Sequence, residues 1–257
     1  MCLILVAWQS RADYPLMLAA NRDEFHARPT DPASFWRDAP KIIAGRDLTA
    51  GGTWLGVTAT GRFAAITNFR DLLPPPADAP SRGKLVGDFL RGNESPAAFM
   101  QRVAADADRY AGFSLFAGTP AELAFFSNRS GAPRRLDPGT YALSNAALDV
   151  PWPKVERMRN EFQRRIEQRP DPEALLDLLN DREPAPDAEL PATGLPLARE
   201  RLLSAPFVVS PTYGTRASSI LLFDAVHRAT FVERGFDPEG LPIETRSFTF
   251  RIAKTDD

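Results

Sequence analysis

A single cysteine, Cys2, has the position best suited to covalent chemistry in this sequence of 257 residues. It directly follows Met1, and a small residue there usually permits removal of the initiator methionine. Removal would leave a thiol and a free α-amine on one residue, so that the amine could act as the base for its own nucleophile. The alternative is a structural role, because free cysteines are among the most buried residue types.

Four further polar groups interrupt or end apolar runs, at Asn21-Arg22-Asp23-Glu24, Thr67-Asn68, Ser144-Asn145 and Thr215-Arg216 with Ser218-Ser219. Strand ends are where a rigid scaffold presents functional groups, although strands ordinarily turn polar there too. An α-amine with a pKa near roughly 8 and a thiol near roughly 8.5 can exchange a proton near neutrality. An arginine would favour the thiolate, and a side-chain amide could donate to the oxyanion that forms when the thiol attacks a carbonyl.

The composition excludes several other classes of function. A net charge of -2 gives no indication of nucleic acid or an anionic membrane surface as partner. One cysteine forbids an internal disulfide, and one cysteine with two histidines is too few for a zinc site. No signal peptide is recognisable and no stretch approaches the length of a membrane span. We therefore expect a cytoplasmic protein without metal or cofactor.

Two short strands are expected to bring Cys2 beside the second polar group. Residues 2–9 form a nearly continuous apolar run, typical of a strand buried on both faces. Residues 16–21 form a second strand after a polar turn at 10–15. A hairpin of these two strands would return Asn21 to Glu24 to the side of Cys2.

The rest of the chain predicts blocks of strands and helices in one domain, residues 1–257. Proline-rich loops are expected at 25–40, at 71–80 and at 181–196, the last as a loop or lid. Further strands are expected at 42–45, 53–58, 63–68, 113–117, 122–127, 141–145, 206–210, 218–224, 228–233 and 246–251. Helices are expected at 82–91 with Ser81 as cap, at 95–110, at 153–168 and at 172–180. This order favours an antiparallel α+β layered fold over alternating βαβ units.

Seven stretches match the pattern of one family in the family's order. They are MCLILVAW, LAANRDEFHARPT, IIAGRD, GGTWLGVTATGRFAAITN, SRGKLV, ALSNAALDVPWPK and YGTRASSILL, from residue 1 to 222. The sequence thus resembles the NRDE family, also called the transport and Golgi organisation family. That family in turn is similar to the N-terminal nucleophile hydrolases of the choloylglycine hydrolase and penicillin V acylase group.

The resemblance implies a fold and a set of site residues. The implied fold is α+β, a four-layer αββα sandwich with two mostly antiparallel sheets between helical layers. Cys2 would be the nucleophile, with Asp23 near its amine and thiol. Asn145 would be an oxyanion-hole donor and Arg216 an arginine near the nucleophile, and Asn68 is the second candidate for the oxyanion site.

Arg22 is a further candidate whose role stays open. The hydrolase relatives place an arginine and an aspartate three positions apart, whereas Arg22 and Asp23 are adjacent here. Neighbours in a regular strand point to opposite faces, so that if Asp23 faces Cys2, Arg22 does not, unless the strand has already ended. The alternative for Arg22 is an ion pair with Glu24 that braces the following loop.

The resemblance implies an N-terminal cysteine amidohydrolase or acyltransferase that acts on a small acylated amide or thioester through an acyl-Cys2 intermediate. The alternative is a binding or trafficking protein for a lipid, acyl-CoA or haem, since eukaryotic relatives are associated with Golgi organisation and with haem and lipid handling. A wide apolar cavity without converging polar groups would favour such a carrier. For haem, the strong axial candidates are Cys2, His26 and His227. A structural interaction protein is a third possibility, without a specific feature in its favour.

Overall fold

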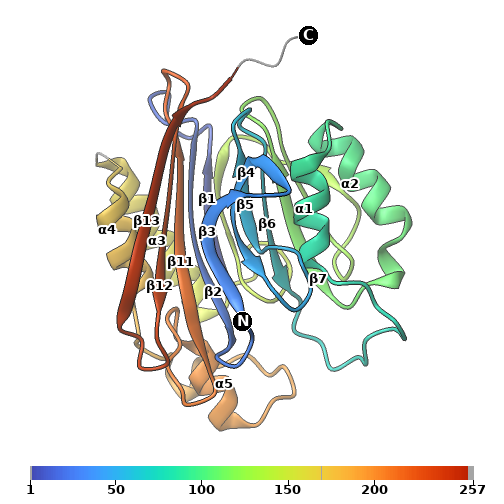
Figure 1. Ribbon diagram of the computed structural model, residues 1–257. Coiled ribbons are helices and arrows are strands. Elements are labelled where there is room, and N and C mark those ends of the chain that lie inside the picture. The colour runs from blue at the N-terminus through green and yellow to red at the C-terminus, as the bar shows by residue number, and fades with distance from the viewer. Residues whose placement is uncertain (1, 169, 254–257) are drawn as a thin grey trace.

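The computed structural model describes residues 2–168 and 170–253, and two antiparallel sheets face each other at its centre (Figure 1). Sheet A has the order β10-β1-β2-β11-β12-β13 and sheet B the order β3-β4-β5-β6-β7-β8-β9. The strands of sheet A are β1 (Cys2–Trp8), β2 (Leu16–Phe25), β10 (Gly139–Leu143), β11 (Tyr213–Phe223), β12 (Arg228–Phe236) and β13 (Pro242–Arg251). Those of sheet B are β3 (Thr30–Trp36), β4 (Ala39–Asp47), β5 (Leu55–Thr58), β6 (Phe63–Asn68), β7 (Phe113–Gly118), β8 (Leu123–Ser127) and β9 (Arg134–Arg135).

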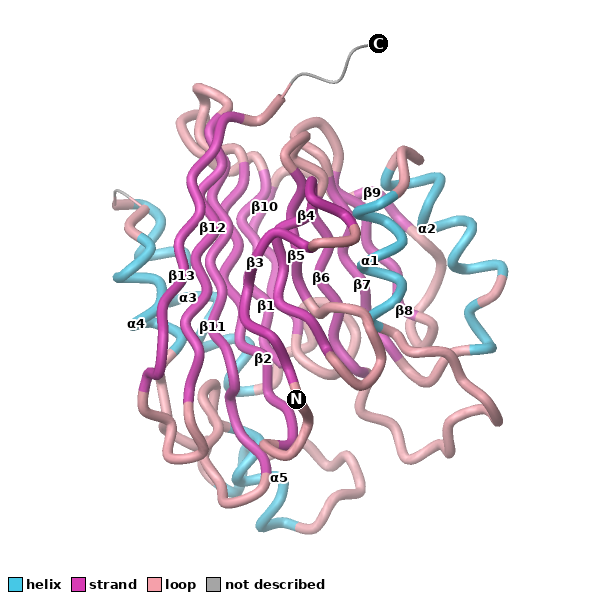
Figure 2. The backbone as a smooth tube through the Cα atoms, in the orientation of Figure 1, coloured by secondary structure: helices cyan, strands magenta, loops and turns pink. Residues whose placement is uncertain are grey.

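Helices cover the outer face of each sheet, so the described chain has four layers (Figure 2). The helices α3 (Pro153–Glu167) and α4 (Pro172–Leu179) pack on sheet A, and α1 (Gly83–Arg91) and α2 (Pro96–Ala105) pack on sheet B. A shorter helix, α5 (Leu197–Ser204), lies near one end of sheet A (Figure 1). The predicted α+β fold with αββα layers is confirmed.

The apolar run at the start of the chain is explained by burial of β1 on both faces. Ile4, Val6 and Trp8 belong to the core between the sheets, whereas Leu3 and Leu5 pack against α3 and α4. A strand that is buried on both faces loses the alternation of apolar and polar residues. β1 lies inside sheet A, so its first residue pairs with β2 on one side, and the pairing with β10 on the other side begins at Ile4.

The predicted hairpin of the first two strands is confirmed, and its register fixes the candidate site. Cys2 pairs with Arg22, and the pairing continues to Trp8 opposite Leu16. The second strand reaches Phe25 rather than ending at residue 21, because β11 pairs along its other edge. The four residues 21–24 are therefore part of the sheet and not of a loop.

Part of the predicted loop at 25–40 is a strand. Residues 30–36 form β3 at the edge of sheet B, with a register shift between Asp31 and Ser34 that accommodates Pro32. Proline is tolerated on an edge strand because the missing N–H does not break an interior ladder. The loop predicted from the prolines is therefore wrong for residues 30–36, which form an irregular edge strand of sheet B.

Two other assignments near the C-terminal half are corrected. Residues 206–210 are not a strand but a buried connector, in which Phe207 N donates to Asp181 O and Val208 O accepts from Thr215 N. Only strands were predicted in the C-terminal third of the chain. The helix α5 was missed there because it has no continuous apolar stripe. A buried ion pair between Glu200 and Arg70 anchors α5 instead.

The start of α1 also differs from the prediction. Ser81 does not cap the helix; the N-cap residue is Arg82, and no side chain accepts from the first turn. Ser95, by contrast, caps α2 by accepting a hydrogen bond from Ala98 N at 3.2 Å, with Pro96 in the first turn. In the described residues, no helix is both long and apolar enough to cross a membrane.

Candidate active site

Cys2 opens onto a small polar cavity of about 110 Å³. Its walls come from both sheets and from the start of α1, and they include Arg22, Asn68, Arg82 and Gly83. Cys2 is a free cysteine, and the residue as a whole is of intermediate exposure. The first residue of a buried strand therefore meets a small space that side chains from both sheets surround, which is the arrangement that a positioned nucleophile requires.

Asn145 and Ser144 hold the main chain of Cys2. The Cys2 backbone N–H donates to Asn145 Oδ1 at 3.1 Å, and Ser144 Oγ donates to the Cys2 carbonyl at 3.0 Å. Asn145 Nδ2 donates to the Asn68 carbonyl at 2.7 Å, so the asparagine links β1 to the end of β6. Asn145 is only 2% exposed. The predicted oxyanion donor thus lies beside the nitrogen atom of Cys2 that would become its α-amine.

Arg22 shares the Cys2 face of sheet A, because residues directly opposite in an antiparallel pair point to the same side. Its guanidinium stacks over Trp54 at 4.2 Å from the ring centroid, and Nη2 lies 4.0 Å from Glu24 Oε2. The side chain is 6% exposed, and its Nη1 has no hydrogen-bond partner among the described residues. The Arg22–Glu24 ion pair is confirmed, but it lines the cavity.

Asp23 has its carboxylate on the opposite face of sheet A, where Thr215 Oγ1 donates to Oδ1 at 2.7 Å. Burial raises the pKa of the Asp23 carboxyl, and the charge of Lys154 opposes that rise. Asp23 still contributes to the cavity wall, and a hydrogen bond from its backbone favours the Cys2 thiolate. Its charge therefore acts on Cys2 from behind the sheet.

Lys154, at the start of α3, is a buried cation that the sequence reasoning missed. It is 2% exposed, and Nζ donates to the Leu203 carbonyl at 2.9 Å. Burial lowers the pKa of Lys154 to about 8, with Asp23 as the main charge that opposes the shift. The available signal was a lysine between two apolar residues of an amphipathic helix, in a chain whose other cations are almost all arginine.

The Cys2 thiol is less acidic than the sequence suggested. An arginine was expected to favour the thiolate, and Arg22 does lower the pKa of Cys2. Burial, the largest influence, raises the pKa of the thiol, and the negative charge of Asp23 adds to the rise. The pKa of Cys2 is raised overall, because burial disfavours the thiolate more than the nearby cation favours it.

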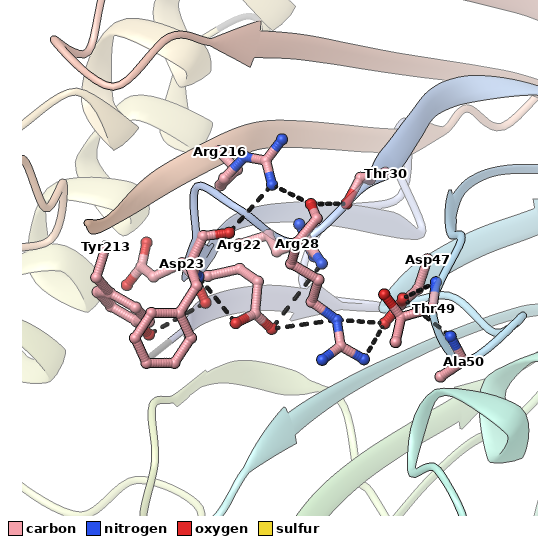
Figure 3. Close-up of polar contacts among 11 residues, drawn as sticks. Arg22, Asp23, Arg28, Thr30, Asp47, Thr49, Ala50, Tyr213 and Arg216 are labelled. Carbon is pink, nitrogen blue, oxygen red and sulfur yellow. Dashed lines mark hydrogen bonds and ion pairs between the residues drawn. The ribbon is translucent and has the colours of Figure 1, made fainter. Parts of the chain in front are cut away.

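Arg216, predicted to lie near the nucleophile, is not among the described residues that line the Cys2 cavity, although its charge acts on Arg22 in the cavity wall. It occupies the bulge of β11 where the register shifts between Thr215 and Ala217, and bulges redirect side chains. Its Nη1 donates to the carbonyls of Phe25 at 3.2 Å and Arg28 at 2.6 Å, which braces the turn after β2 (Figure 3). Arg82, missed in the sequence, lines the cavity instead.

A chain of charges stiffens one side of the cavity (Figure 3). Arg28 lies between two carboxylates, with Nη2 2.7 Å from Asp47 Oδ2 and Nε 3.9 Å from Glu24 Oε2. Asp47 also accepts from the backbone of Thr49 at 3.0 Å and Ala50 at 3.2 Å. These contacts fix the turn after β4 beside the turn after β2.

Gly52 allows α1 to approach this turn. A Cβ at Gly52 would lie 2.4 Å from the Gly83 carbonyl carbon and 2.8 Å from Lys84 N, both backbone atoms. We expect Gly52→Ala to destabilise the fold by about 1–3 kcal/mol, the usual cost of overpacking, and to widen the cavity. Urea unfolding measures the loss. Gly235→Ala is the control, because its Cβ would meet only side-chain atoms, of Ile243 at 3.4 Å and of Glu244 at 3.8 Å, and an equal loss in both variants would contradict the close approach.

Neither histidine belongs to the site. His26 contacts Ser210 O at 3.0 Å through its ring, His227 occupies an exposed turn, and neither lines the Cys2 cavity. Across residues 2–168 and 170–253, no group of three or more histidine, cysteine or carboxylate residues is arranged to hold a metal ion.

Comparison of the sequence with those of known proteins identifies the family of this chain. The chain matches the family described as Transport and Golgi organisation 2 over residues 1–238. It is 35% identical over 278 residues to the Transport and Golgi organization 2 homolog of Mus musculus, covering 98% of this chain and 99% of that protein. It is 30% identical over 269 residues to Transport and Golgi organization protein 2 of Drosophila melanogaster, covering 93% and 95%.

The fold is similar to that of a solved hydrolase structure. The C2A mutant of conjugated bile acid hydrolase from Clostridium perfringens superposes with a TM-score of 0.50 and 8% identity, over 100% of this chain and 99% of that chain. At that identity the likeness concerns the fold, which is that of the N-terminal nucleophile hydrolases. The family match over residues 1–238 and the similarity over nearly the whole length of the relatives show that the chain belongs to the Transport and Golgi organisation 2 family.

Proposed function

We propose that this protein is an N-terminal cysteine amidohydrolase or acyltransferase for a small acylated amide or thioester. The observation that carries the proposal is the position of Cys2, at the end of a buried strand, with its thiol at a polar cavity and its backbone nitrogen 3.1 Å from Asn145 Oδ1. The hydrolase with the similar fold is named for a mutation at its own position 2. The proposal requires removal of Met1, which lies outside the described residues.

In the acylation step, the Cys2 sulfur attacks the substrate carbonyl and the thiol proton passes to the Cys2 α-amine. The raised pKa of the thiol makes this transfer necessary, because little thiolate exists before substrate arrives. The tetrahedral oxyanion collapses, the carbon–nitrogen or carbon–sulfur bond breaks, and the α-ammonium returns the proton to the leaving group. An acyl-thioester on Cys2 remains.

In the deacylation step, water or an amine attacks the thioester while the α-amine takes the proton of the nucleophile. The Cys2 thiol leaves with that proton, and the acid or the new amide departs. Asn145 holds the α-amine through its Oδ1, and a negative charge on Asp23 would favour the protonated form of the amine from behind the sheet. These two residues therefore set the orientation and the charge of the base.

Asn68 is better placed than Asn145 to stabilise the oxyanion. The Asn68 side chain is exposed at the cavity wall, whereas Asn145 spends its Oδ1 on Cys2 and one Nδ2 hydrogen on the Asn68 carbonyl. We expect Asn68→Ala to lower kcat by about 10²–10³-fold, the usual effect of one lost oxyanion donor. Steady-state kinetics measure the loss, with exposed Asn160→Ala on α3 as control. Unchanged kcat in Asn68→Ala would exclude this role.

The proposed reaction is tested with a panel of short acyl p-nitroanilides and acyl thioesters. We expect release of p-nitroaniline or thiol by the wild-type protein and none by Cys2→Ala. Turnover that persists in Cys2→Ala would contradict the nucleophile. A carrier for a lipid or haem finds less support at this site, because the cavity around Cys2 is small and polar rather than wide and apolar.

A further inference from the structure

The first turn of α1 faces the Cys2 cavity without a cap. Gly83 and Arg82 line the cavity, and the first turn contains no acidic residue. Lys84 N and Leu85 N donate to the carbonyls of Ser81 and Arg82, and no side chain of the described residues caps the helix. The start of a helix carries unsatisfied N–H groups and a partial positive charge, which together favour an anion. A helix start alone defines no site, and a second feature of this cavity points the same way.

Arg22 supplies that second, independent feature. Its side chain is only 6% exposed and lines the cavity, and Nη1 has no hydrogen-bond partner among the described residues. A buried guanidinium nitrogen without a hydrogen-bond partner costs free energy that a bound anion would recover. The carboxylate of Glu24 offsets this cost in part, since it lies 4.0 Å from Arg22 and 3.9 Å from Arg28.

Arg82 adds a second guanidinium to the same wall. Its Nη1 donates to the Gly112 carbonyl at 2.9 Å, which fixes the side chain without neutralising it. Burial lowers the pKa of both Arg22 and Arg82, and a Cys2 thiolate would raise both, so both cations lie within electrostatic reach of the sulfur. The wall also contains the carboxylates of Glu24 and Asp47, but both lie against Arg28, so Arg22, Arg82 and the start of α1 remain as the positive groups beside the nucleophile.

We infer that this wall of the cavity binds a carboxylate carried on the acyl part of the substrate, held by Arg22, Arg82 and the N-terminus of α1. The inference rests on the proposed function and names its substrate class. A guanidinium matches the planar oxygens of a carboxylate. The volume of about 110 Å³ holds roughly four groups of water size, which suits a short acyl chain. A short dicarboxylic acyl group fits both the charge and the volume.

The test compares iodoacetate with iodoacetamide, two alkylating reagents of similar size that differ in charge. The protein has one cysteine, so the intact mass reports Cys2 alone. We expect the ratio of the iodoacetate rate to the iodoacetamide rate to exceed that of free cysteine by at least about tenfold, equivalent to 1.4 kcal/mol. A ratio equal to that of free cysteine would overturn the carboxylate site.

Arg82→Gln is the main variant, because Arg82 is less buried than Arg22. We expect it to lower the iodoacetate rate far more than the iodoacetamide rate, so that the ratio falls toward that of free cysteine. Arg91→Gln, at the other end of α1 and paired with Asp38, is the matched control and should keep the wild-type ratio. An unchanged ratio in Arg82→Gln would also overturn the inference.

A substrate pair separates this inference from the proposed function. Alkylation needs neither turnover nor removal of Met1. A high iodoacetate ratio without turnover of any substrate would support the carboxylate site and count against the enzyme. If turnover occurs, succinyl p-nitroanilide should exceed butyryl p-nitroanilide in kcat/KM by at least about tenfold, equivalent to 1.4 kcal/mol. Turnover that favours the butyryl substrate would support the proposed enzyme but would overturn the carboxylate site.

Discussion

Replacing Asp23 with asparagine is expected to lower the free energy of unfolding by about 1–3 kcal/mol, because the buried Lys154 ammonium loses the main charge that favours it, and this loss outweighs the gain from no longer ionising a carboxyl whose pKa burial raises. Lys154 is 2% exposed and cannot move its Nζ to solvent without displacing α3. The remaining partner, the Leu203 carbonyl, satisfies a hydrogen bond but not the charge. Urea unfolding at neutral pH measures the loss.

The double variant Asp23→Asn with Lys154→Met separates a charge pair from general damage. Removing both charges should recover at least half of the loss, because neither ion then remains buried alone. Asp108→Asn, at an exposed position, is the control and should change stability by less than about 0.5 kcal/mol. Strictly additive losses in the double variant would mean that the two side chains are not coupled.

Replacing Glu233 with glutamine is expected to stabilise the protein by about 3 kcal/mol at pH 8 and to have little effect at pH 4. Glu233 is 4% exposed, and burial raises its pKa to about 7. Its oxygens accept from Ala33 N at 2.6 Å and Ser219 Oγ at 3.4 Å, and a glutamine oxygen can keep the first of these bonds. The gain comes from removing a carboxylate that must ionise inside the core.

The sign of this pH dependence follows from proton binding. A carboxyl group with a raised pKa holds its proton in the folded state while the unfolded state has already lost it, between its ordinary pKa of about 4.3 and about 7. Wild-type stability should therefore fall as pH rises through that window. The facing cations, Arg22 and Arg246, moderate the fall because they favour the ionised form. Glu239→Gln, in an exposed turn, is the control.

Thermal unfolding of the wild-type protein and of Glu233→Gln, from pH 4 to pH 8, measures the effect. The Tm of the wild type should lie below that of Glu233→Gln at the alkaline end, and the two Tm values should meet near pH 4. A constant separation at every pH would show that Glu233 does not titrate between those values in the folded protein.

The sequence predicts the parts of the fold that depend on local pattern. The apolar run at 2–9 and the run at 16–21 gave the hairpin, because each strand declares itself by its own residues. The stripe Val155, Met158, Phe162 and Ile166 gave α3 for the same reason. β3 and α5 were missed because their stability comes from distant contacts, such as Arg70 with Glu200, that no local window contains.

The residues of the candidate site also fall into two groups, those predicted by local sequence pattern and those whose positions depend on distant contacts. Cys2, Asn145 and Asn68 come together because strand ends present polar residues at a common edge, which the pattern of polar interruptions anticipated. The face of Arg22 depends on the register between β1 and β2, and the direction of Arg216 depends on a bulge. Neither can be read from spacing alone. Arg82 and Lys154 look like ordinary helix cations until burial is known.

The most direct test of the central claim is the intact mass of the protein with the masses of its N-terminal peptides, before and after incubation with a short acyl thioester. The account predicts a chain that begins at Cys2 without Met1 and that gains one acyl group on Cys2, whereas Cys2→Ala gains none. A protein that retains Met1 in full, or an acyl group found on any residue other than Cys2, would contradict it.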